Sequence, residues 1–304
     1  MTSSIIKRKI TKSIDIKSIL KSLILLMKPR VMSLVIFTCA VGYLISNPIL
    51  NNFNSIISIC FVAIGAGASG CLNMWYDSDI DALMSRTCLR PIPTGKIGKN
   101  YALIFGIILS VFSVIGLNYF ANTLSAALLL FTILFYLFVY TIWLKRKTPQ
   151  NIVIGGAAGA LPPVIGWTIS TDSISIVPII LFLIIFFWTP SHFWALSLYK
   201  TNDYKKAKIP MLPISSGIEK TKIYIFIYSL FMIPLIMLPY IINFSGLIYF
   251  IPALFLTFYY NYVCFDLLNY KKNKFDSKKA QKVFGYSILY LFLIFLLILI
   301  DSII

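Results

Sequence analysis

Nine stretches of roughly 20 mostly apolar residues, each long enough as a helix to cross the ~30 Å core of a bilayer, follow one another along this chain. Hydrophobic residues make up 59% of the 304 residues and charged residues 12%, about half the charged share of a soluble domain. We therefore expect an all-α, polytopic membrane protein: one domain over 1–304, with nine transmembrane helices around a central cavity. The spans are predicted near 31–48, 55–75, 101–119, 122–144, 151–169, 174–199, 222–242, 246–268 and 283–303.

All 27 Lys and Arg residues lie before the first span or in alternate connections, at 77–100, 145–147, 200–222 and 271–282. The connections between them, near 49–54, 120–121, 170–173 and 243–245, contain none. The positive-inside rule then places the N-terminus and the basic connections in the cytoplasm and the C-terminus outside, which in a bacterium means the cell inner membrane. Topology thus accounts for the net charge of +17, and we expect no nucleic acid partner.

The first 28 residues form a basic segment without a cleavable signal, so we expect it to be retained in the cytoplasm. Within it, residues 14–28 alternate apolar and basic positions at helical spacing. This pattern predicts an amphipathic helix lying on the lipid surface. The alternative is a disordered basic tail. The five cysteines are scattered without metal-ligand spacing. Four lie in or at apolar segments and are interpreted as small core residues.

Three of the ten acidic residues lie close together at the cytoplasmic end of the second span. On a helix, Asn73, Asp77 and Asp81 fall within about 80° of one another, whereas Asp79 points elsewhere as a solvated or capping residue. Acidic side chains near membrane depth are costly and mark function by default. Carboxylate and amide oxygens suit Mg²⁺, as one ion or two. The alternative is an ordinary polar helix end.

Basic side chains follow this acidic stripe. Arg86 and Arg90 lie four residues apart, and guanidinium groups match phosphate oxygens bidentately. The pattern favours a diphosphate held between metal and arginines. Alternatively, the arginines pair directly with Asp77 and Asp81 or serve topology alone. Lys145, after the fourth span, is a further candidate for binding diphosphate or for topology.

A second polar cluster ends the sixth span, on the same cytoplasmic face. Tyr199 and Asp203 lie four residues apart, and a continuous helix would place the single histidine, His192, on the same stripe. His192 falls well inside the membrane. It is interpreted either as a contact or ligand for a tetrapyrrole or as a polar anchor between helices.

The pattern Asn73-x3-Asp77-x3-Asp81, followed by Arg86-Thr87-x2-Arg90-Pro91, resembles the first signature of the intramembrane, UbiA-type aromatic prenyltransferase superfamily. Three stretches, at 72–77, 148–163 and 188–196, resemble more specifically the heme-modifying members of that superfamily. The resemblance runs from about residue 25 to 300 and keeps the nine-span layout.

The resemblance implies transfer of farnesyl from farnesyl diphosphate to a vinyl group of protoheme IX, giving heme O for terminal oxidases and releasing diphosphate. Heme A synthase or oxidase assembly proteins are then the expected partners, besides the bilayer. Tyr199 stands where relatives often have a second aspartate. The residues implied are catalytic Asp77, Asp81 and Asp203; metal-binding Asn73, Asp77, Asp81 and Asp203; diphosphate-binding Arg86, Arg90, Lys145 and Tyr199; and heme-binding His192.

Three other functions remain open. The nearest is a sister prenyltransferase that uses an aromatic quinone precursor on the same scaffold. An ion transporter would instead need acids along a pore at mid-membrane. A non-catalytic heme-binding protein would need no paired acidic motifs and no Mg²⁺.

Overall fold

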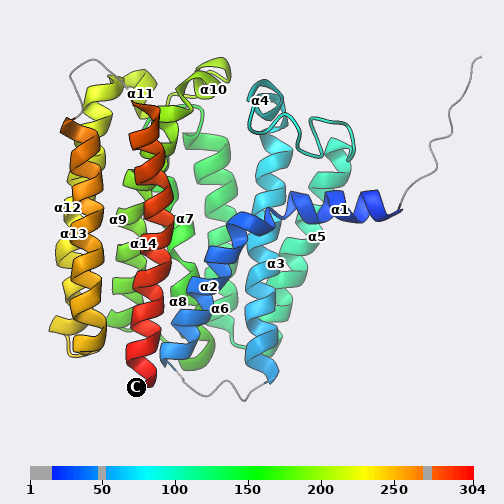
Figure 1. The fold of residues 1–304 in the computed structure, drawn as a ribbon. Coiled ribbons are helices and arrows are strands. Elements are labelled where there is room, and N and C mark those ends of the chain that lie inside the picture. The colour runs from blue at the N-terminus through cyan, green and yellow to red at the C-terminus, as the bar shows by residue number, and fades with distance from the viewer. Residues whose placement is uncertain (1–15, 47–52, 270–275) are drawn as a thin grey trace, which may run out of the picture.

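The computed structural model describes residues 16–46, 53–269 and 276–304, and all regular structure among them is helical (Figure 1). Nine spans among these residues are long and apolar enough to cross a membrane, which confirms the predicted all-α architecture. The observed boundaries of the spans agree with the predicted ones within a few residues. The last helix differs most, because it begins at Ser277 and its span was predicted to begin near residue 283. The spans are α2 (Pro29–Ser46), α3 (Phe53–Tyr76), α5 (Lys99–Phe120), α6 (Thr123–Leu134) with η1 (Phe135–Leu144), α7 (Asn151–Ala160) with α8 (Pro162–Thr171), α9 (Ile176–Tyr199), α12 (Gly217–Ile241), α13 (Leu247–Asn269) and α14 (Ser277–Ile303).

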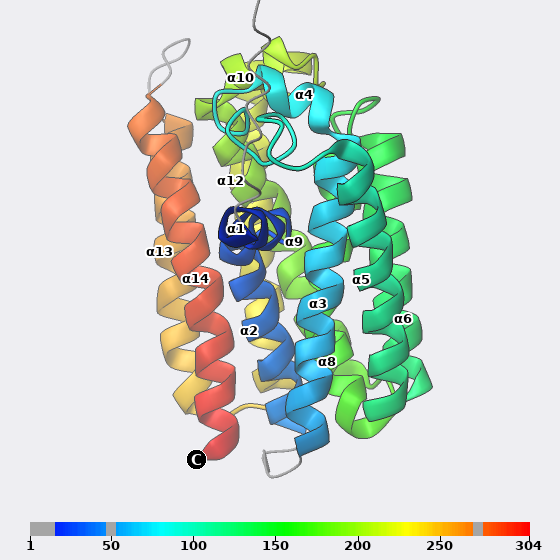
Figure 2. The same cartoon turned by 90° about the vertical axis from the view of Figure 1, so that its right-hand side faces the viewer.

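Four short helices lie outside the spans. They are α1 (Ile16–Leu26), α4 (Ser78–Leu83), α10 (Thr201–Lys206) and α11 (Leu212–Ser215). α4, α10 and α11 gather at one end of the bundle, and the C-terminus lies at the other end (Figure 1). α1 runs across the long helices rather than along them (Figures 1 and 2), and the predicted amphipathic segment is helical over this range. The first 15 residues of the predicted N-terminal segment lie outside the described residues.

Small residues allow the fifth span to pack closely, as its composition indicates. This span is two helices, because Pro162 and Pro163 open a new helix after Leu161. α8 packs against α2 with almost no space between the backbones. A Cβ atom on Gly166 would lie 1.9 Å from the Cys39 carbonyl oxygen, and one on Gly42 would lie 2.1 Å from the Pro163 carbonyl oxygen.

The sixth span, α9, packs against α7, α8, α12 and α14 and so forms much of the interior. It ends at Tyr199, and α10 begins at Thr201. The prediction of one continuous helix from His192 to Asp203 is therefore wrong. Lys200 leaves helical geometry, with φ −111° and ψ 18°, so Asp203 does not continue the stripe of His192 and Tyr199.

Candidate active site

The first acidic motif lies where α3 ends and α4 begins. The backbone keeps helical spacing across this junction, because Asp77 N donates to Asn73 O at 2.9 Å and Asp81 N donates to Asp77 O at 2.8 Å. Asn73, Asp77 and Asp81 thus remain successive members of one stripe, and all three are buried. Such burial of two carboxylates requires cationic or hydrogen-bonding partners.

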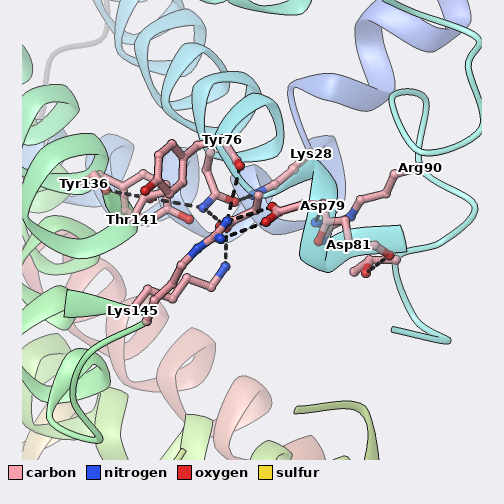
Figure 3. A network of polar contacts seen from close by, with 12 residues as sticks. Lys28, Tyr76, Asp79, Asp81, Arg90, Tyr136, Thr141 and Lys145 are labelled. Atoms are coloured by element: carbon pink, nitrogen blue, oxygen red, sulfur yellow. Dashed lines mark hydrogen bonds and ion pairs between the residues drawn. The ribbon is translucent and has the colours of Figure 1, made fainter. Parts of the chain in front are cut away.

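Asp77 is completely buried and is held by two basic side chains from the end of the fourth span. Lys145 Nζ binds Asp77 Oδ2, which also accepts a hydrogen bond from Asn73 Nδ2 at 2.7 Å. Arg146 Nη2 lies 3.5 Å from Asp77 Oδ1. Asp77 Oδ1 has no hydrogen bond, although it is buried. Lys145 therefore contacts the acidic stripe (Figure 3), and Arg146 contacts Asp77 as well.

Asp81 is paired with Arg90, whose Nη1 lies 2.6 Å from Asp81 Oδ2. Direct pairing of an arginine with the acidic stripe was one of the two alternatives, and the structure contains it for Arg90. Arg86 behaves differently. It is exposed and forms no hydrogen bond or ion pair among the described residues.

Asp79 points away from the stripe, as the sequence predicts, and 58% of its side chain is exposed. It is an ion-pair partner as well, because Arg146 donates to both of its carboxylate oxygens at 2.8 Å. These bonds from Arg146 lower the pKa of Asp79 below its ordinary value. Asp79 thus holds the guanidinium that also reaches Asp77.

The second motif meets the loop that follows the first. Ser85 donates to the Asp203 carboxylate from its backbone N at 3.3 Å and from its hydroxyl at 2.9 and 3.0 Å. Burial raises the pKa of Asp203, but the Ser85 hydrogen bonds and the charges of Lys200 and Lys206 outweigh it and hold the pKa below its ordinary value. The Tyr199 ring lies edge-on to Phe284 of α14, with ring centroids 5.9 Å apart.

Replacing Ser85 by alanine tests this link between the motifs. We expect Ser85→Ala to lower kcat/KM for farnesyl diphosphate about tenfold, since Asp203 loses a hydroxyl donor and with it part of its fixed orientation. Ser110→Ala, which removes a hydroxyl that bonds only to its own helix at Gly106 O, is the matched control. Equal kinetics of Ser85→Ala and wild type would show that the loop does not position Asp203.

His192 is buried against α14 rather than placed beside the acidic motifs. Its ring is stacked between Trp188 and Phe284, at centroid distances of 4.3 and 4.6 Å. Ser287 gives its hydroxyl hydrogen to Phe284 O at 2.6 Å, so its oxygen accepts from His192 Nδ1–H, also at 2.6 Å. The lone pair is then on Nε2, which has no hydrogen-bond partner among the described residues.

Lys28 is a site residue that the sequence analysis missed. It lies between α1 and α2 with a left-handed backbone, φ 53°, and its Nζ donates to Asn73 Oδ1 at 2.6 Å. Burial, together with the charges of Arg90 and Lys145, lowers the pKa of Lys28 to about 7. In the sequence Lys28 looks like any other basic residue of a cytoplasmic segment, so only its position just before the first span could have pointed to it.

The structure thus gathers Asn73, Asp77, Asp81 and four basic side chains at one end of the bundle. It links Asp203 to them through Ser85, but the three carboxylates do not converge. Among the described residues, no three Asp, Glu, His or Cys side chains lie close enough together to form a metal-binding group. Ser85 and Thr141, both missed from the sequence, hold members of the two motifs in place.

Comparison with known proteins identifies the family of this site. The model of the UbiA prenyltransferase family matches residues 35–298, which is most of the chain. The chain belongs to the UbiA prenyltransferase family. Within it, a protein named protoheme IX farnesyltransferase from Pelagibacter ubique (strain HTCC1062) is 71% identical over 278 residues, covering 91% of this chain and 92% of the relative. This UbiA member is accordingly a prenyltransferase of the protoheme IX farnesyltransferase group.

Solved structures share the UbiA fold at low sequence identity. A structure described as digeranylgeranylglyceryl phosphate synthase superimposes with a TM-score of 0.77 at 22% identity, covering 94% of this chain and 99% of that one. A UbiA homologue from Archaeoglobus fulgidus, bound to DMAPP and Mg²⁺, gives a TM-score of 0.67 at 18% identity, covering 91% and 99%. These likenesses support the nine-span fold of the UbiA family.

Proposed function

We propose that this chain transfers a farnesyl group from farnesyl diphosphate to a vinyl group of protoheme IX, giving heme O and diphosphate. The observation that carries the proposal is the pair of buried carboxylates, Asp77 and Asp81, each ion-paired to basic side chains at one end of the bundle. Acidic and basic side chains placed next to each other in this way suit the binding of diphosphate. A metal ion would join the diphosphate to the carboxylates, and the basic side chains would bind its oxygens directly. The family relationship supplies the substrates.

The residues present fit Mg²⁺. Asp77 Oδ1 is buried without a hydrogen bond. The other candidate metal ligands of the stripe are the amide oxygen of Asn73 and the carboxylate oxygens of Asp81, and a hard cation prefers such oxygen ligands. The A. fulgidus homologue holds Mg²⁺ together with a prenyl diphosphate. Asn73, Asp77 and Asp81 would hold the ion, and Asp203 is proposed as a further metal ligand from the second motif. Bound Mg²⁺ supplies neutralising charge for the leaving diphosphate.

The basic side chains stabilise the leaving group in this proposal. The allylic C–O bond of farnesyl diphosphate breaks, and the electron pair leaves with diphosphate. Lys145 and Arg90 already lie beside Asp77 and Asp81. Arg86 forms no ion pair among the described residues, so its guanidinium is available to phosphate oxygens. Tyr199 ends α9, four residues before Asp203, and is proposed to bind the same diphosphate.

The farnesyl cation then reacts with the vinyl group of protoheme. The vinyl π electrons form the new C–C bond, and the cation left beside the porphyrin is captured by water, which loses a proton. The product carries a hydroxyethylfarnesyl side chain. The surrounding apolar helices exclude bulk water and so delay hydrolysis of the farnesyl cation.

His192 is proposed to contact the heme. Its Nε2 has no hydrogen-bond partner among the described residues, and its Nδ1–H is fixed by Ser287, an arrangement typical of a ligating histidine with an orienting partner. We expect His192→Ala to abolish the change in the heme absorption spectrum on binding while the KM for farnesyl diphosphate stays within about twofold. Ser197→Ala, which removes a buried hydroxyl that donates to Trp194 O of the same helix, is the control. An unchanged heme spectrum in His192→Ala would make the histidine a structural anchor.

A quinone-type prenyltransferase is the alternative that needs a direct test. Purified protein is supplied with farnesyl diphosphate and Mg²⁺, and with equal concentrations of protoheme and 4-hydroxybenzoate. We expect farnesylation of protoheme alone. Farnesylated hydroxybenzoate as the main product would overturn the proposed acceptor and leave the prenyltransferase activity in place.

We also propose the cell inner membrane as the location, with the α4 and α10 end in the cytoplasm and the C-terminus outside. The described basic connections support this orientation, because they all lie at that end. The proposed substrates fit it too, since a charged diphosphate would reach the acidic motifs directly from the cytoplasm. Heme A synthase or an oxidase assembly protein would take up the product.

A further inference from the structure

The second half of the fourth span, η1, is wound as a π-helix over ten residues. π-Helices are rare, usually last one turn and often lie at functional sites. Lys145 N donates to Tyr140 O at 2.9 Å, the five-residue bond that defines this geometry. Residues five apart point about 140° apart on an α-helix, but in this wider helix they lie on the same side. Tyr136 and Thr141 consequently share the side of the helix that faces α3 (Figure 3).

Thr141 connects this π-helix to the first acidic motif. The side chain is completely buried. Its hydroxyl donates to Tyr136 O, five residues earlier, at 2.8 Å, and its oxygen accepts from Asn73 Nδ2 at 3.1 Å. A threonine hydroxyl has a single hydrogen. Since that hydrogen is used on Tyr136, Thr141 can offer Asn73 only an acceptor.

This constraint fixes the orientation of the Asn73 amide. Its NH₂ group faces two acceptors, Thr141 Oγ1 and Asp77 Oδ2, so its two hydrogens are both used. The amide oxygen, the atom of Asn73 able to bind a cation, must therefore point the other way, where Lys28 Nζ donates to it at 2.6 Å. An amide oxygen has two lone pairs, so one remains for a metal ion beside this lysine. Without the Thr141 acceptor, one hydrogen of the Asn73 NH₂ group would be buried without a partner. The present orientation of the amide would then be less strongly favoured in free energy over one in which the amide is rotated by about 180°.

We propose that Thr141 is a positioning residue for the farnesyl-transfer reaction, which presents the Asn73 oxygen to the metal and diphosphate. The π-helix is what makes this contact, because it brings Thr141 over Tyr136 and toward α3. The inference rests on the proposed function, in which Asn73 binds Mg²⁺. It assigns Thr141 no contact with substrate.

The test separates the hydroxyl from the methyl group of Thr141. Thr141→Val keeps the shape and loses the hydroxyl; Thr141→Ser keeps the hydroxyl. Thr141→Ala, compared with Thr141→Ser, supplies the same contrast if the valine variant does not fold. Thr132→Val is the matched control. Thr132 lies in α6, the helix just before η1, and among the described residues its hydroxyl bonds only to Leu128 O of that helix.

Two readouts are measured on the full-length protein in lipid nanodiscs. The first is Mn²⁺ binding in the presence of inorganic diphosphate, followed by the EPR signal of free Mn²⁺. The second is the Mg²⁺ concentration that gives half-maximal farnesyl transfer. Loss of an orienting partner typically weakens metal affinity 10–100-fold. We expect Thr141→Val to weaken both readouts about tenfold, with Thr141→Ser and Thr132→Val within about twofold of wild type.

A double-mutant cycle shows whether Thr141 acts through Asn73. In an Asn73→Ala background, we expect Thr141→Val to cause no further loss of Mn²⁺ affinity. Wild-type Mn²⁺ affinity in Thr141→Val would overturn the inference, as would equal losses in the serine and valine variants. If wild type shows no metal-dependent farnesyl transfer at all, the proposed function fails instead, and the two failures remain distinguishable.

Discussion

Asp77→Asn is expected to lower kcat for farnesyl transfer about 10³-fold, the scale on which removing a key electrostatic contact to a transition state acts. The substitution keeps the shape and removes the charge that Lys145 and Arg146 surround. It also replaces one of the two oxygens by an NH₂ group. Because Asp77 Oδ2 accepts hydrogen bonds from Lys145 and Asn73, the NH₂ group is expected at the position of Oδ1, the buried oxygen that is proposed to bind metal. The rate is measured as farnesylated heme formed per folded enzyme, at saturating Mg²⁺.

The control for Asp77→Asn is Asp266→Asn. Asp266 also forms an ion pair with a lysine, Lys279, at the ends of α13 and α14. Among the described residues it forms no hydrogen bond or ion pair with a residue of either motif. We expect its activity to stay within about twofold of wild type. Near-normal kcat in Asp77→Asn would remove the first motif from the chemistry, and equal losses in both variants would indicate a general effect of lost charge.

Gly166→Ala is expected to cause the largest loss of stability. The added Cβ would lie 1.9 Å from the Cys39 carbonyl oxygen, so α8 and α2 must separate. Overpacking costs about 1–3 kcal/mol and occasionally more, and here the obstacle is backbone that cannot rotate away. The measurement is the temperature at which half of the detergent-solubilised protein loses its monodisperse peak, which we expect to fall by several degrees.

Gly159→Ala in the same span is the matched control, since a Cβ there would have nothing within 4 Å. The alanine should leave stability unchanged or raise it by about 0.5–1 kcal/mol, because alanine favours helix more than glycine does. If Gly166→Ala were as stable as Gly159→Ala, the close contact between α2 and α8 would not exist in the protein.

The fold was largely predictable because the bilayer imposes it. Apolar length and the placement of basic residues are local properties of a sequence, and both spans and their order follow from them. The acidic stripe was predictable for the same reason: Asn73, Asp77 and Asp81 repeat every four residues, and the chain keeps that spacing even across the α3–α4 junction.

Long-range contacts were not predictable from these patterns. Ser85 and Asp203 are 118 residues apart, and Lys28 and Asn73 are 45 apart, so their hydrogen bonds depend on how the helices pack. The helix break after Tyr199 was missed because the polar residues His192, Tyr199 and Asp203 keep helical spacing in the sequence across the break. The π-helix was missed because its residues would fit an α-helix equally well by composition, and only the i+5 bonds distinguish the two.

The most direct test of the central claim is mass spectrometry of tetrapyrroles after membranes containing this protein are incubated with protoheme, farnesyl diphosphate and Mg²⁺. Parallel samples contain EDTA or the Asp77→Asn variant. We predict a product heavier than protoheme by one farnesyl group and one hydroxyl group, formed with Mg²⁺ and absent from both parallel samples. Unchanged protoheme, from membranes shown to hold folded wild-type protein, would contradict the account.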